Sequence, residues 1–162
     1  MIYSKLINHT TDKGSQIYLN DHQAIIKVHQ KKGKHGDCTP AFRSLKSDDI
    51  LILHQKANRP NVITHIVRVI NGNQLIEDHM SSPLYPFIRN CEVLYYLDPQ
   101  KTRSIKTTGE SYIFNTNLKS VSMQDMYGST NFYVGNGNCK AYPYSYDDLI
   151  AKISKHSSYS KI

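Results

Sequence analysis

The chain has 162 residues, of which 39% are hydrophobic and 20% charged, and its formal net charge is +7. This length fits one domain, and no apolar run approaches the roughly 20 residues of a membrane span. The N-terminus also lacks the apolar stretch of a signal peptide. We therefore expect a single cytoplasmic domain over residues 1–162 that makes no membrane contact.

Three cysteines, Cys38, Cys91 and Cys139, lie far apart in the chain and form no CxxC pair. An odd number at such spacing argues against a disulfide framework and against a cysteine-rich zinc site. We expect reduced thiols.

The first elements lie in the N-terminal quarter. Residues 15–30 predict two short strands, and residues 31–36 predict a basic loop. Thr39 and Pro40 are typical of a helix start, because Pro at the first helical position loses no hydrogen bond. The helix is expected to end near Lys46. Its apolar face would hold Ala41, Phe42 and Leu45.

The middle of the chain predicts a strand pair. Residues 49–54 form a continuous aliphatic run, which is typical of a strand buried on both faces. Residues 62–70 alternate in part, and Asn71-Gly72 then predicts a hairpin turn with residues 74–78 as the returning strand. Strict alternation would place Val62, Thr64, Ile66, Arg68 and Ile70 on one face and Ile63, His65, Val67 and Val69 on the other.

The C-terminal part predicts a strand at residues 91–97 and a weaker one at residues 110–115. Ser145 is expected to cap a helix over residues 146–156, with acids in its first turn and bases in its last, as the helix dipole favours. Residues 157–162 are expected to be a frayed tail. The fold class is α+β and mostly β: a small mixed-topology β-barrel with two or three short helices.

Catalytic and metal-binding patterns are scarce. His35 and Cys38 stand in a basic stretch that would lower the thiol pKa, but neighbours in the chain need not be in contact. None of the eight histidines falls in an HxxxH or HExxH spacing, and no lysine follows an acid by two residues as in many metal-dependent nucleases. We expect no catalytic residue, metal ion or cofactor. An enzyme using His54 or His65, which could face each other across a hairpin, remains an alternative.

Basic residues gather in two stretches without acids. Residues 22–36 contain Lys27, Lys31, Lys32 and Lys34, and residues 99–109 contain Lys101, Arg103 and Lys106. Patches of one sign are the electrostatic footprint of a protein that contacts phosphates. They favour DNA or RNA as the partner.

Residues 41–74, "AFRSLKSDDILILHQKANRPNVITHIVRVINGNQ", resemble a recurring segment of the PUA-like superfamily, which includes the EVE, YTH and ASCH domains. In that group a short helix ends in a leucine and a basic residue, and a glycine-containing turn leads into a hydrophobic strand, a polar loop and a second strand. Phe42, Arg43, Leu45 and Lys46 match the helix end and Asp49 the turn. This chain departs by placing Ser47-Asp48 at the glycine position and by having no tryptophan for a YTH-type aromatic cage.

The resemblance implies a PUA-like barrel whose pocket accepts one nucleobase, modified or flipped out of a helix. His54, Gln55 and Asn58 would then bond a base edge. Phosphate contacts would come from Lys56 and Arg59, together with Lys31, Lys32, Lys34, Arg43, Lys101 and Arg103. The stacking candidates are Tyr85, Phe87, Tyr95 and Tyr96, and the neighbours Tyr95 and Tyr96 should point to opposite faces of their strand. We therefore expect a nucleic-acid-binding module. The second alternative is a protein-interaction module, such as a toxin or defence-system partner, whose basic surface meets an acidic protein.

Overall fold

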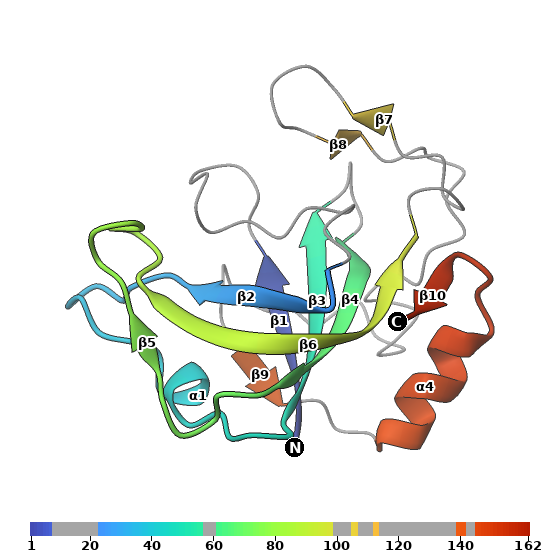
Figure 1. The fold of residues 1–162 in the computed structure, drawn as a ribbon, viewed down its shortest axis with the longest axis horizontal. Coiled ribbons are helices and arrows are strands. Elements are labelled where there is room, and N and C mark those ends of the chain that lie inside the picture. The colour runs from blue at the N-terminus through green and yellow to red at the C-terminus, as the bar shows by residue number, and fades with distance from the viewer. Residues whose placement is uncertain (8–22, 57–60, 99–104, 107–111, 114–138, 142–144) are drawn as a thin grey trace.

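The computed structural model describes residues 1–7, 23–56, 61–98, 105–106, 112–113, 139–141 and 145–162 (Figure 1). Eight of the strands in these ranges form one mixed sheet, while β7 (Ile105–Lys106) and β8 (Tyr112–Ile113) pair with each other. The described helices are α1 (Pro40–Arg43) and α4 (Tyr146–Ser154). The chain is thus mostly β with short helices, as its sequence predicts.

The large sheet is built around the β3–β4 hairpin. Its strands are β1 (Ile2–Ile7), β2 (Ile25–Gln30), β3 (Ile50–Lys56), β4 (Asn61–Val69), β5 (Ile76–Glu77), β6 (Phe87–Leu97), β9 (Cys139–Ala141) and β10 (Tyr159–Lys161). Their order is β10-β6-β4-β3-β1-β9, and β2 and β5 also pair with β6. Strand β1 runs parallel to β3, and every other pair in this sheet is antiparallel.

Strands β1 and β10 of the large sheet are among those that the sequence-based expectation lacks. Strand β1, which was not predicted, lies beside the central strand β3. Strand β10 forms where a frayed tail was expected, and its Tyr159 is 8% exposed and donates a hydrogen bond of 2.7 Å to the carbonyl oxygen of Ile63. Burial of an aromatic ring and a satisfied hydroxyl hold this end of the chain in the sheet.

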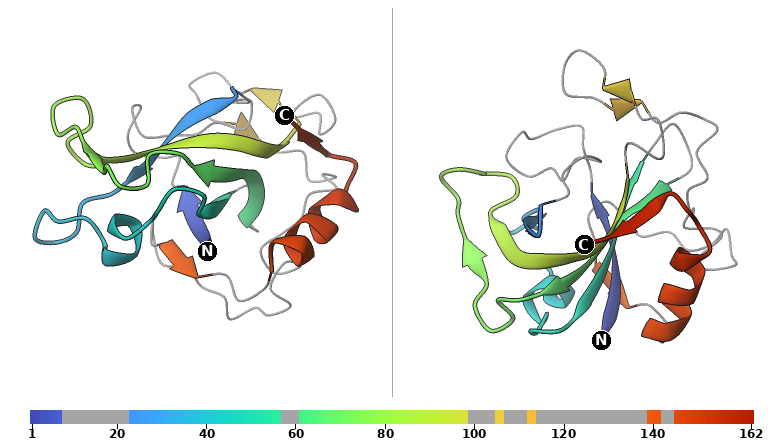
Figure 2. Two further views of the ribbon diagram at one scale, coloured as in Figure 1. Left: turned by 60° about the horizontal axis from the view of Figure 1, so that its bottom comes forward. Right: turned by 45° about the vertical axis from the view of Figure 1, so that its right-hand side comes forward.

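Strand β6 bends the sheet. It is 11 residues long and pairs with β4, β2, β5 and β10 along its length. Figures 1 and 2 show it as a long curved strand across the molecule. Among the strands that the structure describes, the pairing does not return from β2 to β1, so the sheet is open where a closed barrel was expected. A side-chain bond, Lys5 Nζ to Gln30 Oε1 at 2.7 Å, links these two strands instead.

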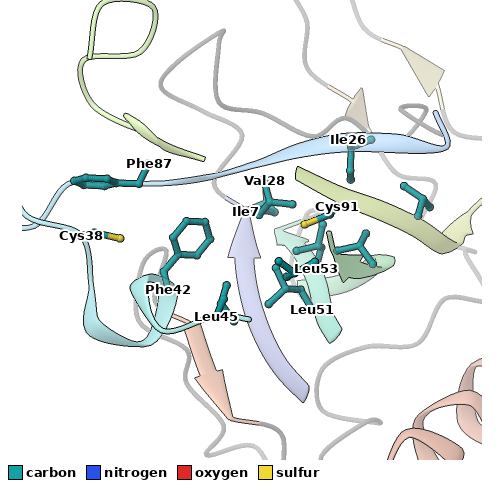
Figure 3. Packing of buried hydrophobic residues seen from close by; sticks show 13 residues of the cluster. Ile7, Ile26, Val28, Cys38, Phe42, Leu45, Leu51, Leu53, Phe87 and Cys91 are labelled. Atoms are coloured by element: carbon teal, nitrogen blue, oxygen red, sulfur yellow. The ribbon is translucent and has the colours of Figure 1, made fainter. Parts of the chain in front are cut away.

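Apolar side chains form one cluster on each face of the sheet. The first cluster lies against α4 and comprises Ile52, Ile63, Ile66, Leu97, Leu149, Ile153 and Tyr159. The second cluster includes Ile7, Ile26, Val28, Cys38, Phe42, Leu45, Leu51, Leu53, Phe87 and Cys91 (Figure 3). Leu51 and Leu53 belong to one cluster and Ile52 to the other, and all three are 0% exposed. The prediction of a strand buried on both faces is confirmed.

A bulge interrupts the β3–β4 hairpin. Leu53 pairs with His65, whereas His54 pairs with Ile63, which makes Thr64 the extra residue of β4 at the bulge. Such an extra residue reverses the facing of the side chains beyond it. Ile63 and Ile66 therefore both join the first cluster, so the predicted strict alternation is wrong there. The prediction that His54 and His65 face each other is also wrong, because His65 pairs with Leu53 and His54 pairs with Ile63.

Both predicted helices start where expected. Thr39 precedes α1 with Pro40 in its first turn, although the helix ends at Arg43, sooner than predicted. In α4, Ser145 and Asp148 form a reciprocal capping box, which satisfies backbone groups that a helix start leaves open. In the part of the chain that the structure describes, no helix is long and apolar enough to cross a membrane.

The chain after β4 does not turn back along β4 as predicted, because β5 pairs with β6. Gly72 instead packs against the turn before β3, where a Cβ would lie 1.6 Å from the backbone nitrogen of Ser47. Its amide donates to Ser47 Oγ at 3.1 Å. Glycine is therefore required here by close approach, since this position has no positive φ.

Arg89 of β6 is buried beneath the same region, with 1% of the residue exposed, and stabilises it through hydrogen bonds. Its Nη1 donates to the carbonyl oxygens of Asn71 at 3.2 Å and Gly72 at 3.0 Å. Its Nη2 donates to those of Phe42 at 3.3 Å and Arg43 at 2.8 Å. The guanidinium thus joins α1 to the turn after β4.

Candidate nucleic-acid interface

The basic loop, residues 31–37, follows β2 and presents its lysines outward. Lys31, Lys32 and Lys34 are all exposed. The loop is closed by hydrogen bonds from Gly33 N to Asp37 O at 2.7 Å and from Gly36 N to Gly33 O at 3.1 Å. Gly36 has φ +82°, a left-handed conformation that a glycine adopts without strain. The lysines therefore extend from a fixed turn.

A second loop, residues 78–86, lies beside the basic loop and is here termed the capped loop. The two are joined by a hydrogen bond of 3.1 Å from Lys32 N to Leu84 O. Asp78 closes the capped loop, because its amide donates to Pro86 O at 2.8 Å and its Oδ1 accepts from Ser81 N at 2.9 Å. These bonds from Ser81 lower the pKa of the Asp78 carboxyl.

Two apolar side chains stand out from the capped loop. Met80 is 92% exposed and Leu84 is 43% exposed, whereas the loop's Ser82 is buried. The two joined loops thus carry both exposed cations and exposed apolar side chains.

Arg43 is exposed at the end of α1, and its Nη2 lies 3.9 Å from Glu77 Oε1. At that distance and exposure the pairing with Glu77 is weak, which leaves the guanidinium free to reorient toward another anion.

The structure places the four stacking candidates mainly in packing positions. Tyr85 is 8% exposed and Phe87 is 2% exposed. Tyr95 packs against the first cluster and Tyr96 against the second, so the prediction that they point to opposite faces is confirmed. Tyr95 is the candidate that lies on the α4 side of the sheet.

His54 is buried in the interior. Its side chain is 1% exposed, and neither ring nitrogen has a hydrogen-bond partner. Burial, together with the nearby Lys5 ammonium, lowers the pKa of His54 to about 3. The ring is therefore neutral at pH 7.

The remaining predicted contacts fall outside what the structure describes. Gln55 and Lys56 belong to β3, but their side chains are not described. Asn58, Arg59, Lys101 and Arg103 lie outside the described ranges.

Thiol chemistry at the basic loop is not supported. Cys38 is buried, and its burial raises the thiol pKa despite the opposing charges of Arg43, Arg89 and Lys5. The expectation of a lowered pKa is wrong because desolvation of the thiolate outweighs the nearby cations. Cys91 is a second buried free thiol, and burial raises its pKa to about 12. Within the described ranges, no three His, Cys, Asp or Glu side chains gather as metal ligands.

An open groove of about 760 Å³ lies between the sheet and the start of α4, and is here termed the α4 groove. Its lining is Met1, Ile2, Asp48, Ile50, Arg68, Leu94, Ser145 and Tyr146. This volume falls in the range of roughly 300–1,000 Å³ that is typical of small-molecule sites. Sequence reasoning missed the groove because its residues come from five separate segments.

No protein-family model, curated protein or solved structure matches this chain.

Proposed function

We propose that this protein is a nucleic-acid-binding module whose basic loop contacts the phosphate backbone. The observation that carries the proposal is the set of three exposed lysines on a turn closed by backbone hydrogen bonds. Because the turn is already formed, little backbone ordering opposes binding. The net charge of +7 adds a long-range attraction to a polyanion.

A PUA-like relationship is part of this proposal. Support comes from the order of elements over residues 40–69: helix α1, a turn, and the β3–β4 hairpin. Asp48 has φ 69° at the turn where that superfamily usually has glycine. Aspartate is one of the few residues other than glycine that tolerates this conformation. Recognition of a modified or flipped base is the finer expectation that follows from the relationship.

The test is fluorescence anisotropy with single- and double-stranded DNA and RNA, plain and methylated, over a range of salt concentrations. The variant carries Lys31→Gln, Lys32→Gln and Lys34→Gln. Its matched control carries Lys46→Gln, Lys155→Gln and Lys161→Gln, three exposed lysines outside the basic loop. Each lost phosphate contact should reduce the slope of log K against log salt by about 0.7–0.9. For three contacts we expect the loop variant to lose a slope of about 2–3 and the control to resemble the wild type.

Absence of binding at low salt would contradict the proposal, as would equal losses in the loop variant and the control.

One observation favours a second candidate function, binding to an acidic protein. Leu84 is exposed next to Lys32 and Met80 is exposed in the same loop, and exposed apolar atoms surrounded by charge are common at protein interfaces. If this candidate is correct, Met80→Ser should abolish capture of a specific acidic protein by the purified chain. Nucleic-acid binding would then be weak and indifferent to sequence and strandedness.

A further inference from the structure

The pairing of the strands determines which side chains form the floor of the α4 groove. Ile2 of β1 pairs with Ile50 of β3, and Ile50 pairs with Arg68 of β4. Arg68 pairs in turn with Glu92 of β6. Paired residues share a face of the sheet, so these side chains form one row across it. Of this row, Ile2, Ile50 and Arg68 line the groove, so its floor is apolar at the β1 end and carries a guanidinium at the β4 end.

The Arg68 side chain has an ion-pair partner, Glu92, and is still accessible to solvent. Its Nε lies 3.1 Å from Glu92 Oε2, and the Arg68 side chain is 42% exposed. The Nε–H makes no hydrogen bond, so Glu92 contributes a charge contact at that end of the guanidinium, and the terminal Nη1 and Nη2 groups form a two-donor fork. A fork of this kind fits two adjacent acceptors on a flat ligand.

The opposite wall comes from the start of α4, where Ser145 and Tyr146 line the groove. Tyr146 is 40% exposed, so its ring is available to a ligand. Burial of its hydroxyl, with Tyr95 nearby, raises the pKa of Tyr146, which keeps the hydroxyl protonated as a donor. Asp48, whose φ is 69°, also lines the groove and supplies its carboxylate.

An apolar floor, an aromatic wall, a two-donor fork and a carboxylate suit a flat heteroaromatic ring with different groups on its two edges. Guanine has this arrangement, because O6 and N7 are adjacent acceptors while N1 and N2 carry hydrogens. Adenine offers no such pair of acceptors, and its N1 would face a carboxylate lone pair. Pyrimidines present less surface to the floor and the ring of Tyr146.

We infer that the α4 groove is a guanine-binding site, in which Arg68 bonds O6 and N7, Asp48 accepts from N1 and N2, and Tyr146 contacts the ring face. The inference rests on the proposed function where the guanine belongs to a nucleic-acid strand. The same chemistry would also bind a free guanine nucleotide, and the experiment separates the two sources.

The first arm titrates the purified protein with the four ribonucleoside monophosphates, GMP, AMP, CMP and UMP, by calorimetry. The second arm measures anisotropy of thymidine 12-mers with a single central guanine or adenine. Both arms use Arg68→Gln and Tyr146→Leu, with Lys155→Gln as an exposed control in the turn after α4. A circular dichroism melt verifies that each variant is folded.

We expect the wild type and Lys155→Gln to prefer guanine by about tenfold or more, the discrimination that a good bidentate contact gives. Arg68→Gln should remove the preference, and Tyr146→Leu should weaken binding of guanine ligands by about tenfold, as loss of one stacked base does. Equal affinity for all four bases would overturn the inference, as would a guanine preference that survives in folded Arg68→Gln.

Failure of the groove and failure of the proposed function have different signatures. If the lysine variant loses its salt slope while no guanine preference exists, the proposed function stands and the groove assignment is overturned. If GMP binds through Arg68 but none of the single- and double-stranded DNA and RNA ligands binds at low salt, the groove assignment stands and the proposed function is overturned.

Discussion

His54 makes stability depend on pH through a single side chain. The folded protein holds this imidazole neutral, with a pKa of about 3, whereas an unperturbed histidine has a pKa of 6.5. Below pH 6.5 the unfolded chain binds a proton that the folded chain does not, so the free energy of unfolding falls as pH falls toward 3. Each pH unit in this window costs about 1.4 kcal/mol, or about 2 kcal/mol between pH 7 and pH 5.

Urea denaturation at pH 7 and pH 5 of wild type and His54→Leu measures the effect. The variant replaces a buried ring that has no hydrogen-bond partner, so we expect its stability at pH 7 to be equal or higher. Between the two pH values it should lose about 2 kcal/mol less than the wild type. Identical pH dependence of the two proteins would show that His54 is not the buried neutral group.

At the scale of elements, the Arg89 side chain connects α1 to the turn after β4 through hydrogen bonds. Its four hydrogen bonds reach carbonyl oxygens of both segments, including the last residues of α1, whose carbonyls have no partner within so short a helix. We expect Arg89→Met to lower the free energy of unfolding by about 3–5 kcal/mol, because the carbonyl oxygens stay buried without donors.

Arg89→Lys provides the sharper comparison for the same connection. A lysine ammonium cannot span both segments as a planar fork does, so most of the loss should persist although the charge is retained. Arg43→Gln, an exposed change at the end of α1, should alter stability by about 0.5 kcal/mol or less. Full rescue by lysine would show that charge, and not the fork geometry, maintains the connection.

Elements were predictable where a local signal is strong. The aliphatic run of β3, the Thr39-Pro40 start of α1 and the Ser145 cap of α4 all act within a few residues. Strand β1 was missed because Lys5 makes it look polar. That lysine is 1% exposed, with Nζ bonded to Gln30 Oε1 and 5.1 Å from the ring centroid of Phe42. Gln30 and Phe42, which create this environment, are 25 and 37 positions from Lys5 in the chain. The sequence pattern of a short segment therefore gives no sign that Lys5 is buried.

At the scale of the whole molecule, the two candidate sites differ in how far the sequence reveals them. The lysines of the basic loop are neighbours in the chain, so charge alone identified them. The α4 groove is assembled by the register of β1, β3, β4 and β6 and by the docking of α4, and no single segment contains it. Figures 1 and 2 show the loop end of β2 and helix α4 at opposite ends of the molecule.

The sheet also joins the two apolar clusters into one structural unit. Strands β3, β4 and β6 contribute residues to both, and Tyr159 ties the C-terminal strand to β4. We therefore expect one cooperative unfolding transition. Ile153→Ala in the first cluster and Phe42→Ala in the second should each lower the free energy of unfolding by about 2–5 kcal/mol. In each variant, far-ultraviolet circular dichroism and tyrosine fluorescence should give coincident transitions. If Ile153→Ala instead produced an early transition and left a second one at the wild-type midpoint, the face covered by α4 would unfold independently of the rest of the sheet.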